Sequence, residues 1–496
     1  MATETAPQGE THRQAGTPDY DVLIIGAGLS GIGVARYLEH EHPERRYLIL
    51  EQRERIGGTW DLFRYPGIRS DSDLHTYGYA FRPWTDEKAI ADGPAILEYI
   101  EATARDEHVA GKIRFSSHVL GADFSRHSSL WTLTVESPDG PQQLTCRWLV
   151  AAAGYFRYDH GYLPEFPGYD RFQGTLVHPQ QWPQDLDYRG KRIVVIGSGA
   201  TAVTLAPALA TSAAHVTMLQ RTPTYVISLP ERDWLANVLK RLLPARRAYA
   251  LTRRKNIWLQ RTVYELSRSH PKLLRRLLLR GVRRRLPRGF DIERHFSPDY
   301  NPWDQRLCSV PDGDLFESIS DGSTSVVTDR IETFVEHGIR LESGATLQAD
   351  IIVTATGLDL IALGGITLTV DGREVVLPEK MVYKSAMLED VPNLALIVGY
   401  TNSSWTLKVD LVCQYLCRLF SYMDARGYRT ATAVNDDPQM ATGPLLDFGA
   451  GYVQRALDRF PLQGEGPWEI KMSYDADAAR LADALDDGVL RFDTAA

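Results

Sequence analysis

The clearest pattern along the chain is a short apolar run, then a glycine-rich turn, then apolar residues at helical spacing. It begins at Tyr20–Ile25, passes through Gly26-Ala-Gly28-Leu-Ser-Gly31 and the segment IGVARYLEH, and closes with a second apolar run that ends at Glu51. Short apolar runs on either side of a helical repeat are typical of two β-strands joined by an α-helix. The chain therefore starts with a predicted βαβ unit.

The glycine spacing in this unit predicts a dinucleotide site. In such a turn Gly26 allows a tight bend, Gly28 lets a pyrophosphate approach the backbone, and Gly31 lets the helix pack on the strand. Glu51 follows Gly26 by 25 residues, at the end of the second strand, where a carboxylate accepts hydrogen bonds from a ribose diol. The alternative is a chance glycine turn in an α/β protein.

The same pattern occurs a second time. The run KRIVVI (191–196) leads into GSGATA (197–202), a helical segment VTLAPALA and a strand HVTMLQ. At the position matching Glu51 stands Gln220, followed by Arg221 and Thr222. An arginine there suits the extra phosphate of NADPH, which a carboxylate would repel. A solvated arginine at the strand end is the alternative.

One site with a carboxylate and one with an arginine predict FAD and NADPH, and hence a flavin reduced by hydride transfer. The electron acceptor is inferred from the four cysteines, Cys146, Cys308, Cys413 and Cys417. Cys413 and Cys417, the only close pair, fall on one face of an apolar helical stretch, which indicates buried core thiols rather than a redox dithiol. Without a dithiol or a metal-binding motif, molecular oxygen is the leading acceptor, and the predicted class is a flavin monooxygenase.

Composition agrees with a protein of several domains and sets its environment. The 496 residues are 44% hydrophobic and 24% charged, and no apolar run is long enough to span a membrane. The net charge of −8 gives no general attraction to nucleic acid. The polar start, residues 1–19, lacks the features of a secretory signal and is expected to be a disordered tail. We expect a cytoplasmic protein.

Two longer motifs carry a resemblance to a known family. The segment 172–183 fits FxGxxxHxxxW[P/D], the signature of class B flavin monooxygenases, through Phe172, Gly174, His178 and Trp182. Residues 57–71 fit [A/G]GxWxxxx[F/Y]P[G/M]xxxD, typical of Baeyer-Villiger monooxygenases. From about Tyr20 to near the C-terminus the chain resembles the actinobacterial ethionamide-activating branch of this family.

The resemblance implies the site residues. Those expected at FAD are Gly26, Gly28, Ser30, Gly31, Glu51, Thr59, Trp60, Asp61, Leu62, Asp71, Tyr77 and Val119. Those expected at NADPH are Arg69, Ser70, Asp71, Gly197, Ser198, Gly199, Ala200, Thr201, Ala202, Val203, Arg221 and Thr222. The chain departs from the family pattern at Gln305, where related enzymes have a lysine, and at Leu358, where an aromatic residue is common.

The resemblance also implies the reaction: oxygen adds to reduced FAD, and the C4a-peroxyflavin converts a hydrophobic ketone into an ester or lactone, with S-oxygenation of sulfides or thioamides as a further activity. Arg306 occupies the position of the active-site arginine, and Asp71 would orient it. A salt bridge from Arg306 to Asp304 or Asp312 is the structural alternative. A heteroatom monooxygenase with incidental ketone activity is the competing function.

His178 and Trp405 each allow two interpretations. His178 lies in a signature expected at the junction between domains, which favours a hinge over proton transfer. Trp405 is either part of the substrate pocket or a core residue.

A strongly basic segment interrupts the second unit. Residues 240–294 hold 18 lysines and arginines against three acids, a local net charge of +15, so the rest of the chain carries −23. Apolar residues recur between the cations, which predicts amphipathic helices. Their polar face is either simply solvated or attached to an anionic membrane surface, and nucleic acid fits poorly. A peripheral membrane protein whose nucleotide sites serve regulation is the third functional hypothesis.

The predicted fold is α/β, with two Rossmann-like dinucleotide-binding domains, for FAD and NADPH, and a helical insertion in the NADPH domain. The FAD domain is expected to comprise residues 20–155 and 358–496, and the NADPH domain residues 156–230 and 299–357, with the insertion at 231–298. The oligomeric state does not follow from the sequence.

Overall fold

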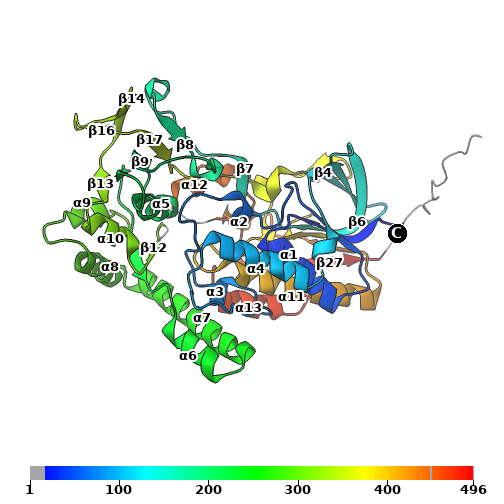
Figure 1. The fold of residues 1–496 in the computed structure, drawn as a ribbon. Coiled ribbons are helices and arrows are strands. Elements are labelled where there is room, and N and C mark those ends of the chain that lie inside the picture. The colour runs from blue at the N-terminus through cyan, green and yellow to red at the C-terminus, as the bar shows by residue number, and fades with distance from the viewer. Residues whose placement is uncertain (1–16, 306, 447–448, 495–496) are drawn as a thin grey trace, which may run out of the picture.

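The protein contains two large β-sheets, a mixed sheet of eleven strands and an all-parallel sheet of five, at opposite ends of the molecule (Figure 1). The structure is a computed structural model and describes residues 17–305, 307–446 and 449–494. The predicted disordered tail at 1–19 lies mostly outside the described residues, and Asp19 directly precedes the first strand. In each sheet one of the two glycine motifs joins a strand to the helix that follows it. This arrangement confirms the predicted α/β fold class.

The first sheet is built around the N-terminal βαβ unit. Strand β1 (Tyr20–Ile25) pairs in parallel with β2 (Tyr47–Leu50) and β6 (Gln142–Ala151). Strands β3 (Ile113–Arg114) and β23 (Leu394–Leu396) extend it in parallel at either side. β23 comes from the C-terminal part, so segments almost 400 residues apart complete one sheet.

Two helices cover the first sheet. They are α1 (Leu29–Glu41), which follows the glycine turn, and α11 (Trp405–Arg426). Gly33 allows their close approach, because a Cβ atom there would lie 3.0 Å from a methyl of Val409. Cys413 and Cys417 of α11 are buried, and burial raises the pKa of both thiols, as expected of core residues.

Strand β6 is shared between two kinds of pairing. Its first half continues an antiparallel meander with β4 (His118–Ser125) and β5 (Leu130–Glu136), while its second half joins the parallel sheet. The remaining strands joined to this sheet are β19 (Thr367–Val370), β20 (Arg373–Glu374), β21 (Val382–Tyr383) and β22 (Met387–Leu388).

The second sheet contains the other glycine motif. Its strands are all parallel, in the order β13 (Thr324–Thr328), β10 (His215–Gln220), β9 (Arg192–Ile196), β17 (Ile351–Thr354) and β8 (Thr175–Val177). Helices α5 (Ala200–Ala210) and α10 (Asp314–Ser320) pack against it. A small antiparallel sheet of β14 (Ile331–Val335), β15 (Gly338–Leu341) and β16 (Thr346–Gln348) follows β13.

Two strands carry the chain between the sheets. β7 (Phe156–Gly161) leads into the second unit, β18 (Leu358–Leu360) leads out of it, and the two pair in antiparallel fashion. This double crossing places the two sheets in contact with a common central region. The exact boundaries of the predicted domains stay a prediction.

A group of helices lies between β11 (Val226–Leu229) and β12 (Cys308–Pro311), at the place of the predicted insertion. It comprises α6 (Trp234–Leu242), α7 (Ala245–Ser269), α8 (Pro271–Arg285) and α9 (Ile292–Phe296). Within the described part of the chain, no helix combines the length and the apolar character that crossing a bilayer requires.

The remaining elements are helices and strand pairs, most of them from the first unit and the C-terminal part. They are α2 (Thr59–Leu62), α3 (Leu74–Tyr77), α4 (Gly93–Asp106), α12 (Gly451–Gln454), α13 (Tyr474–Ala482), and the strand pairs β24 (Thr430–Ala433) with β27 (Leu490–Asp493) and β25 (Gly443–Pro444) with β26 (Leu462–Gln463).

Candidate active site

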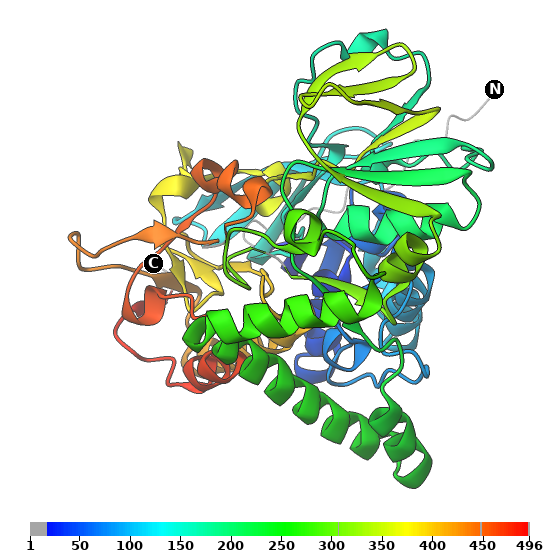
Figure 2. The ribbon, with the colours of Figure 1, turned by 90° about the vertical axis from the view of Figure 1, so that its left-hand side faces the viewer.

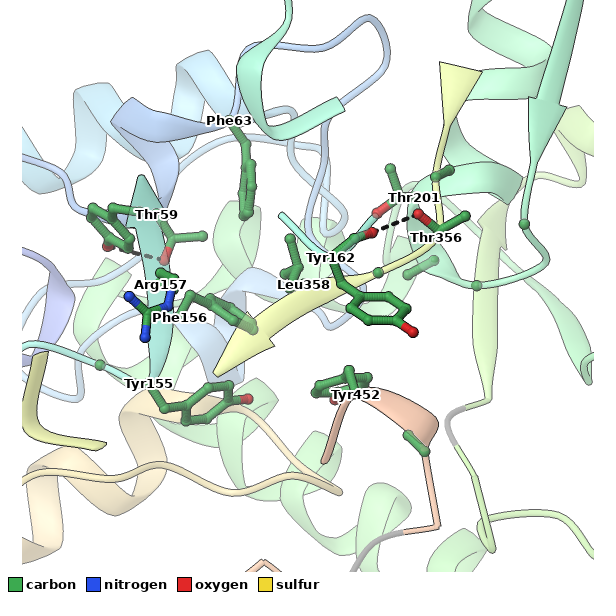
Figure 3. Close-up of a pocket in the computed structure, with 18 of the residues that line it drawn as sticks. Thr59, Phe63, Tyr155, Phe156, Arg157, Tyr162, Thr201, Thr356, Leu358 and Tyr452 are labelled. Carbon is green, nitrogen blue, oxygen red and sulfur yellow. Dashed lines mark hydrogen bonds between the residues drawn. The ribbon is translucent and has the colours of Figure 1, made fainter. Parts of the chain in front are cut away.

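A large cavity of about 1260 Å³ opens at the carboxyl ends of β1 and β9. Residues of both glycine turns line it, together with β7, β18 and the loops that follow them. Figure 3 shows the part of the wall where β7, β18 and α12 meet. In open parallel sheets this edge is where ligands bind, so the cavity is the candidate active site.

The first glycine turn leaves a helix start open to the cavity. Gly26 has a φ of +99°, and a Cβ there would lie 2.9 Å from the carbonyl oxygen of Ala152. Gly28 caps α1 and no side chain caps the helix there. The N–H groups at a helix start need partners and attract anions. This turn therefore fits a pyrophosphate.

Glu51 stands at the end of β2 with its carboxylate at the cavity wall. Its two oxygens accept hydrogen bonds from the backbone N–H groups of Ala27 (2.7 Å) and Arg53 (2.9 Å). The side chain is only 4% exposed, and this burial raises its pKa despite the two hydrogen bonds. A ribose diol donating to this carboxylate would favour its charged form.

Two tryptophans are held in place at the wall by hydrogen bonds. Trp60 donates from Nε1 to the Tyr77 hydroxyl at 2.8 Å. Trp405 donates from Nε1 to the Ser30 hydroxyl at 2.8 Å, and its ring meets the Tyr155 ring edge-on. Trp405 lines the cavity and also packs against the core. Its part in a substrate pocket stays a prediction.

The second glycine turn repeats the geometry of the first. Gly197 has a φ of +141°, and a Cβ there would lie 2.3 Å from the carbonyl oxygen of Ala355. Gly199 caps α5, and no side chain caps the helix there. Arg221 and Thr222 follow β10, line the cavity and are exposed. Among the described residues Arg221 has no ion-pair partner, so its charge is open to a phosphate.

The segment 69–71 lies between the two glycine turns. All three of its residues line the cavity. The Arg69 guanidinium pairs with Asp314 at the start of α10, and the Ser309 hydroxyl donates to the backbone carbonyl of Asp71 at 3.2 Å. The segment from the first unit is thereby tied to the second.

Most predicted site residues reach this one cavity. Its lining includes Gly26, Gly28, Ser30, Glu51, Thr59, Trp60, Arg69, Ser70, Asp71, Tyr77, Val119, Gly197, Ser198, Gly199, Ala200, Thr201, Arg221, Thr222 and Trp405. The departures Gln305 and Leu358 are also on the wall. Arg306, the expected active-site arginine, lies outside the described residues.

Other predicted residues are off the wall. Gly31, Leu62, Ala202 and Val203 pack behind it, and Gly31 has no room for a Cβ, which would lie 1.9 Å from the carbonyl oxygen of Gly26. Asp61 is 1% exposed and forms ion pairs with Arg53, Arg55 and Arg64. The geometry thus gives Asp61 a structural role in holding the loop after β2.

The signature histidine lies behind the cavity, at the two crossing strands. His178 accepts at Nδ1 from the backbone N–H of Gln180, so Nε2 carries the proton and donates to the carbonyl of Gly357 at 3.2 Å. Burial lowers its pKa, which favours this neutral form. Gly161 of β7 makes room for the ring. Both ring nitrogens are engaged by backbone, which supports a hinge role over proton transfer.

The other signature residues pack within the second unit. Phe172 is buried, and a Cβ at Gly174 would lie 2.4 Å from the carbonyl oxygen of Asp350. Trp182 meets Tyr188 edge-on.

Sequence reasoning missed a cluster of wall residues near the crossing strands. The Arg455 guanidinium lies 3.5 Å above the Tyr162 ring, and burial lowers its pKa. Thr356 donates to the Tyr162 carbonyl, as the dashed line in Figure 3 shows. Tyr155 and Tyr452 complete this part of the wall (Figure 3). Tyr162 and Arg455 are almost 300 residues apart, and no local motif links them.

The fold and the site define a class of protein with two dinucleotide-binding units that share one cavity. Residues 19–360 match the family model described as flavin-binding monooxygenase-like. The chain belongs to this family, as its motifs predicted.

Relatives of nearly full length support this membership. MymA of Mycobacterium tuberculosis is 54% identical over 96% of this chain and 98% of its own length. The FAD-containing monooxygenase EthA of the same species is 50% identical over 96% of this chain and 98% of its own.

Solved structures show the same fold at lower identity. A steroid monooxygenase bound to NADP superposes with a TM-score of 0.76 at 22% identity, covering 96% of this chain and 99% of the other. An ε-caprolactone-bound cyclohexanone monooxygenase gives a TM-score of 0.73 at 19% identity, covering 96% and 99%.

Proposed function

We propose that this protein is an FAD-containing, NADPH- and O2-dependent Baeyer-Villiger monooxygenase that converts hydrophobic ketones into esters or lactones. S-oxygenation of sulfides or thioamides is proposed as a further activity. One observation carries the proposal: a single cavity reaches both glycine turns, so two dinucleotides bound there would meet. Relatives named as FAD-containing monooxygenases support the cofactor assignment.

The residues present fit FAD at the first turn. The open start of α1 would hold the pyrophosphate and Glu51 the ribose diol. Trp60, Tyr77 and Val119 offer wall surface beyond the turn. Bound FAD, once reduced by NADPH, supplies the electrons that activate oxygen.

The second turn fits NADPH. The start of α5 would hold its pyrophosphate, and Arg221 with Thr222 would hold the 2′-phosphate. Gln305, in place of a lysine, removes one cation from this end of the wall. We therefore expect the preference for NADPH over NADH to rest mainly on Arg221.

The chain's own groups would protect and stabilise the reacting oxygen. We propose Arg306 as the fixed cation that stabilises the negative charge developing during attack on the ketone, with Asp71 orienting it. Tyr155, Phe156 and Leu358 form an apolar wall that limits water at the reacting centre.

A heteroatom monooxygenase is the second candidate. The observation that favours it is Leu358 on the cavity wall, where ketone-oxidising relatives are expected to have an aromatic residue. A different wall changes which substrates reach the reacting oxygen.

Products of the Arg306→Ala variant separate the two candidates. If Arg306 stabilises attack on a carbonyl, Arg306→Ala abolishes ester formation from phenylacetone, and Arg306→Lys restores part of it. Oxidation of thioanisole, measured with the same enzyme, controls for flavin loading. An unchanged ester yield in Arg306→Ala contradicts the assigned role.

A further inference from the structure

The α6–α7 hairpin presents an unusual set of exposed apolar side chains. On α6, Trp234 (73% exposed), Val238 (40%) and Leu242 (74%) are four residues apart and therefore share one face. On α7, Leu251 and Trp258 are seven residues apart, and both are about half exposed. When such side chains form one contiguous patch with a polar rim, the patch marks a site that meets a protein, a ligand or a membrane.

The two helices hold these side chains close to one another. Asp233, which caps α6, pairs with Lys255 of α7 at 2.5 Å. Trp234 follows Asp233 directly and Trp258 lies one turn beyond Lys255, so the two tryptophans belong to the same end of the hairpin.

The inner face of α7 is fixed to the body of the protein, so the apolar side chains face outward. Arg253 is buried and donates to the carbonyls of His75, Thr76 and Gly78 and to Asp410. In Figure 1 the hairpin projects below the two sheets, and Figure 2 shows the same helices at the lower edge of the molecule.

Cations surround the apolar residues. Residues 234–269 contain nine lysines and arginines and one acid, Glu265. Arg241, Arg246, Arg247 and Arg254 are exposed and, among the described residues, have no ion-pair partner. An outward face of tryptophan and leucine bordered by free cations has the chemistry of an interfacial amphipathic helix.

We propose that the α6–α7 hairpin docks the protein onto the surface of an anionic phospholipid bilayer. Trp234, Leu242, Leu251 and Trp258 enter the headgroup region, and the neighbouring arginines bind lipid phosphates. Two copies of the hairpin would bring like charges together in a symmetric contact, whereas an anionic bilayer offers both an apolar phase and opposite charge, which favours the bilayer as the occupant.

Co-sedimentation of the FAD-loaded protein with vesicles tests the proposal. We expect binding to vesicles containing phosphatidylglycerol, at least fivefold weaker binding to pure phosphatidylcholine, and release by 0.5 M NaCl. Two double variants, W234S/W258S and R247E/R254E, should each lower the bound fraction at least fivefold. A V376S/R373E variant, which changes an exposed valine and an exposed arginine outside the hairpin, should bind as the parent does.

Flavin content and NADPH oxidation should be the same in all variants, because the altered residues lie outside the cavity lining. Equal binding to both kinds of vesicle, or no binding at low salt, overturns the proposal. Self-association without lipid that W234S/W258S abolishes also overturns it, since the face would then bind a second copy of the chain.

Discussion

At the scale of single residues, the site depends on charged groups that the fold keeps from water. Glu51 shows this most clearly, since its burial raises the pKa of the carboxyl although two backbone N–H groups donate to it. The apoprotein thus carries an acidic group that is costly to ionise. A ligand that donates to this group offsets the cost.

Glu51→Gln should weaken FAD binding, at some cost to the apoprotein as well, because the amide has one acceptor oxygen and the carboxylate accepts from two backbone N–H groups, those of Ala27 and Arg53. The variant loses a charge-assisted hydrogen bond worth about 1.5–3 kcal/mol, which corresponds to roughly a 10- to 150-fold rise in the FAD dissociation constant. Titration of apoprotein with FAD, followed by flavin fluorescence, measures this constant. An unchanged constant would remove Glu51 from the proposed ribose site.

Arg221→Ala should reduce the discrimination between NADPH and NADH. Loss of a guanidinium that binds a phosphate costs about 1.5–3 kcal/mol, so we expect kcat/KM for NADPH to fall at least tenfold and that for NADH to stay within twofold. Arg189→Ala, at an exposed arginine outside the cavity lining, is the matched control. Equal losses with both coenzymes would contradict a phosphate-binding role.

At the scale of elements, local sequence patterns predicted the two βαβ units well, because strand and helix periods and glycine turns are local properties. The helical insertion was predicted for the same reason. Particular contacts between distant segments were not predicted: they include Arg455 above Tyr162 and the pairing of β23 with β6, although residues 358–496 were expected in the same domain as residues 20–155. The family resemblance places Asp61 at the FAD, which stays a prediction, and the motif gives no sign of the ion pairs that Asp61 forms with Arg53, Arg55 and Arg64.

The helical insertion shows that a charge pattern does not predict which basic residues are buried. Its basic residues were expected on the surface, because arginine is commonly exposed. Arg253 is instead buried: it pairs with Asp410 of α11 at 2.9 Å and donates to the carbonyls of His75 and Thr76 in α3, which fixes α7 to both helices. Only the tertiary structure separates this residue from Arg254, which faces outward.

Breaking the Arg253 pair should destabilise the docking of the insertion. Arg253→Met leaves Asp410 buried without its cation, at a cost of about 3–5 kcal/mol. Adding Asp410→Asn should recover part of this loss, because the buried charge is then gone. Urea unfolding of the parent, the single variants and the double variant measures the coupling. Additive effects of the two substitutions would show that the pair contributes no stability of its own.

At the scale of the whole molecule, buried histidines should make stability depend on pH. Burial lowers the pKa of His75 to about 4 and also lowers those of His178 and His295. In the unfolded chain histidine has a pKa of about 6.5. The folded state therefore binds fewer protons below pH 6.5, and its stability falls as the pH falls towards the folded-state values.

We expect His75 alone to lower the free energy of unfolding by about 2 kcal/mol between pH 7 and pH 5, because the unfolded chain takes up a proton at this residue and the folded protein does not. The change in the urea midpoint between these pH values measures the loss. His75→Phe, which keeps the ring packing against Tyr249, should make the pH dependence shallower. A stability that rises as the pH falls would contradict this assignment.

The central claim is that the reduction of FAD and the transfer of oxygen to the substrate both take place in the cavity that the two glycine turns line. Its most direct test is product analysis of the FAD-reconstituted protein with NADPH and phenylacetone under ¹⁸O2. The account predicts benzyl acetate with one ¹⁸O atom inserted, formed in step with NADPH oxidation. NADPH oxidation that yields only hydrogen peroxide from this ketone, while a sulfide is oxygenated under the same conditions, would contradict the Baeyer-Villiger assignment.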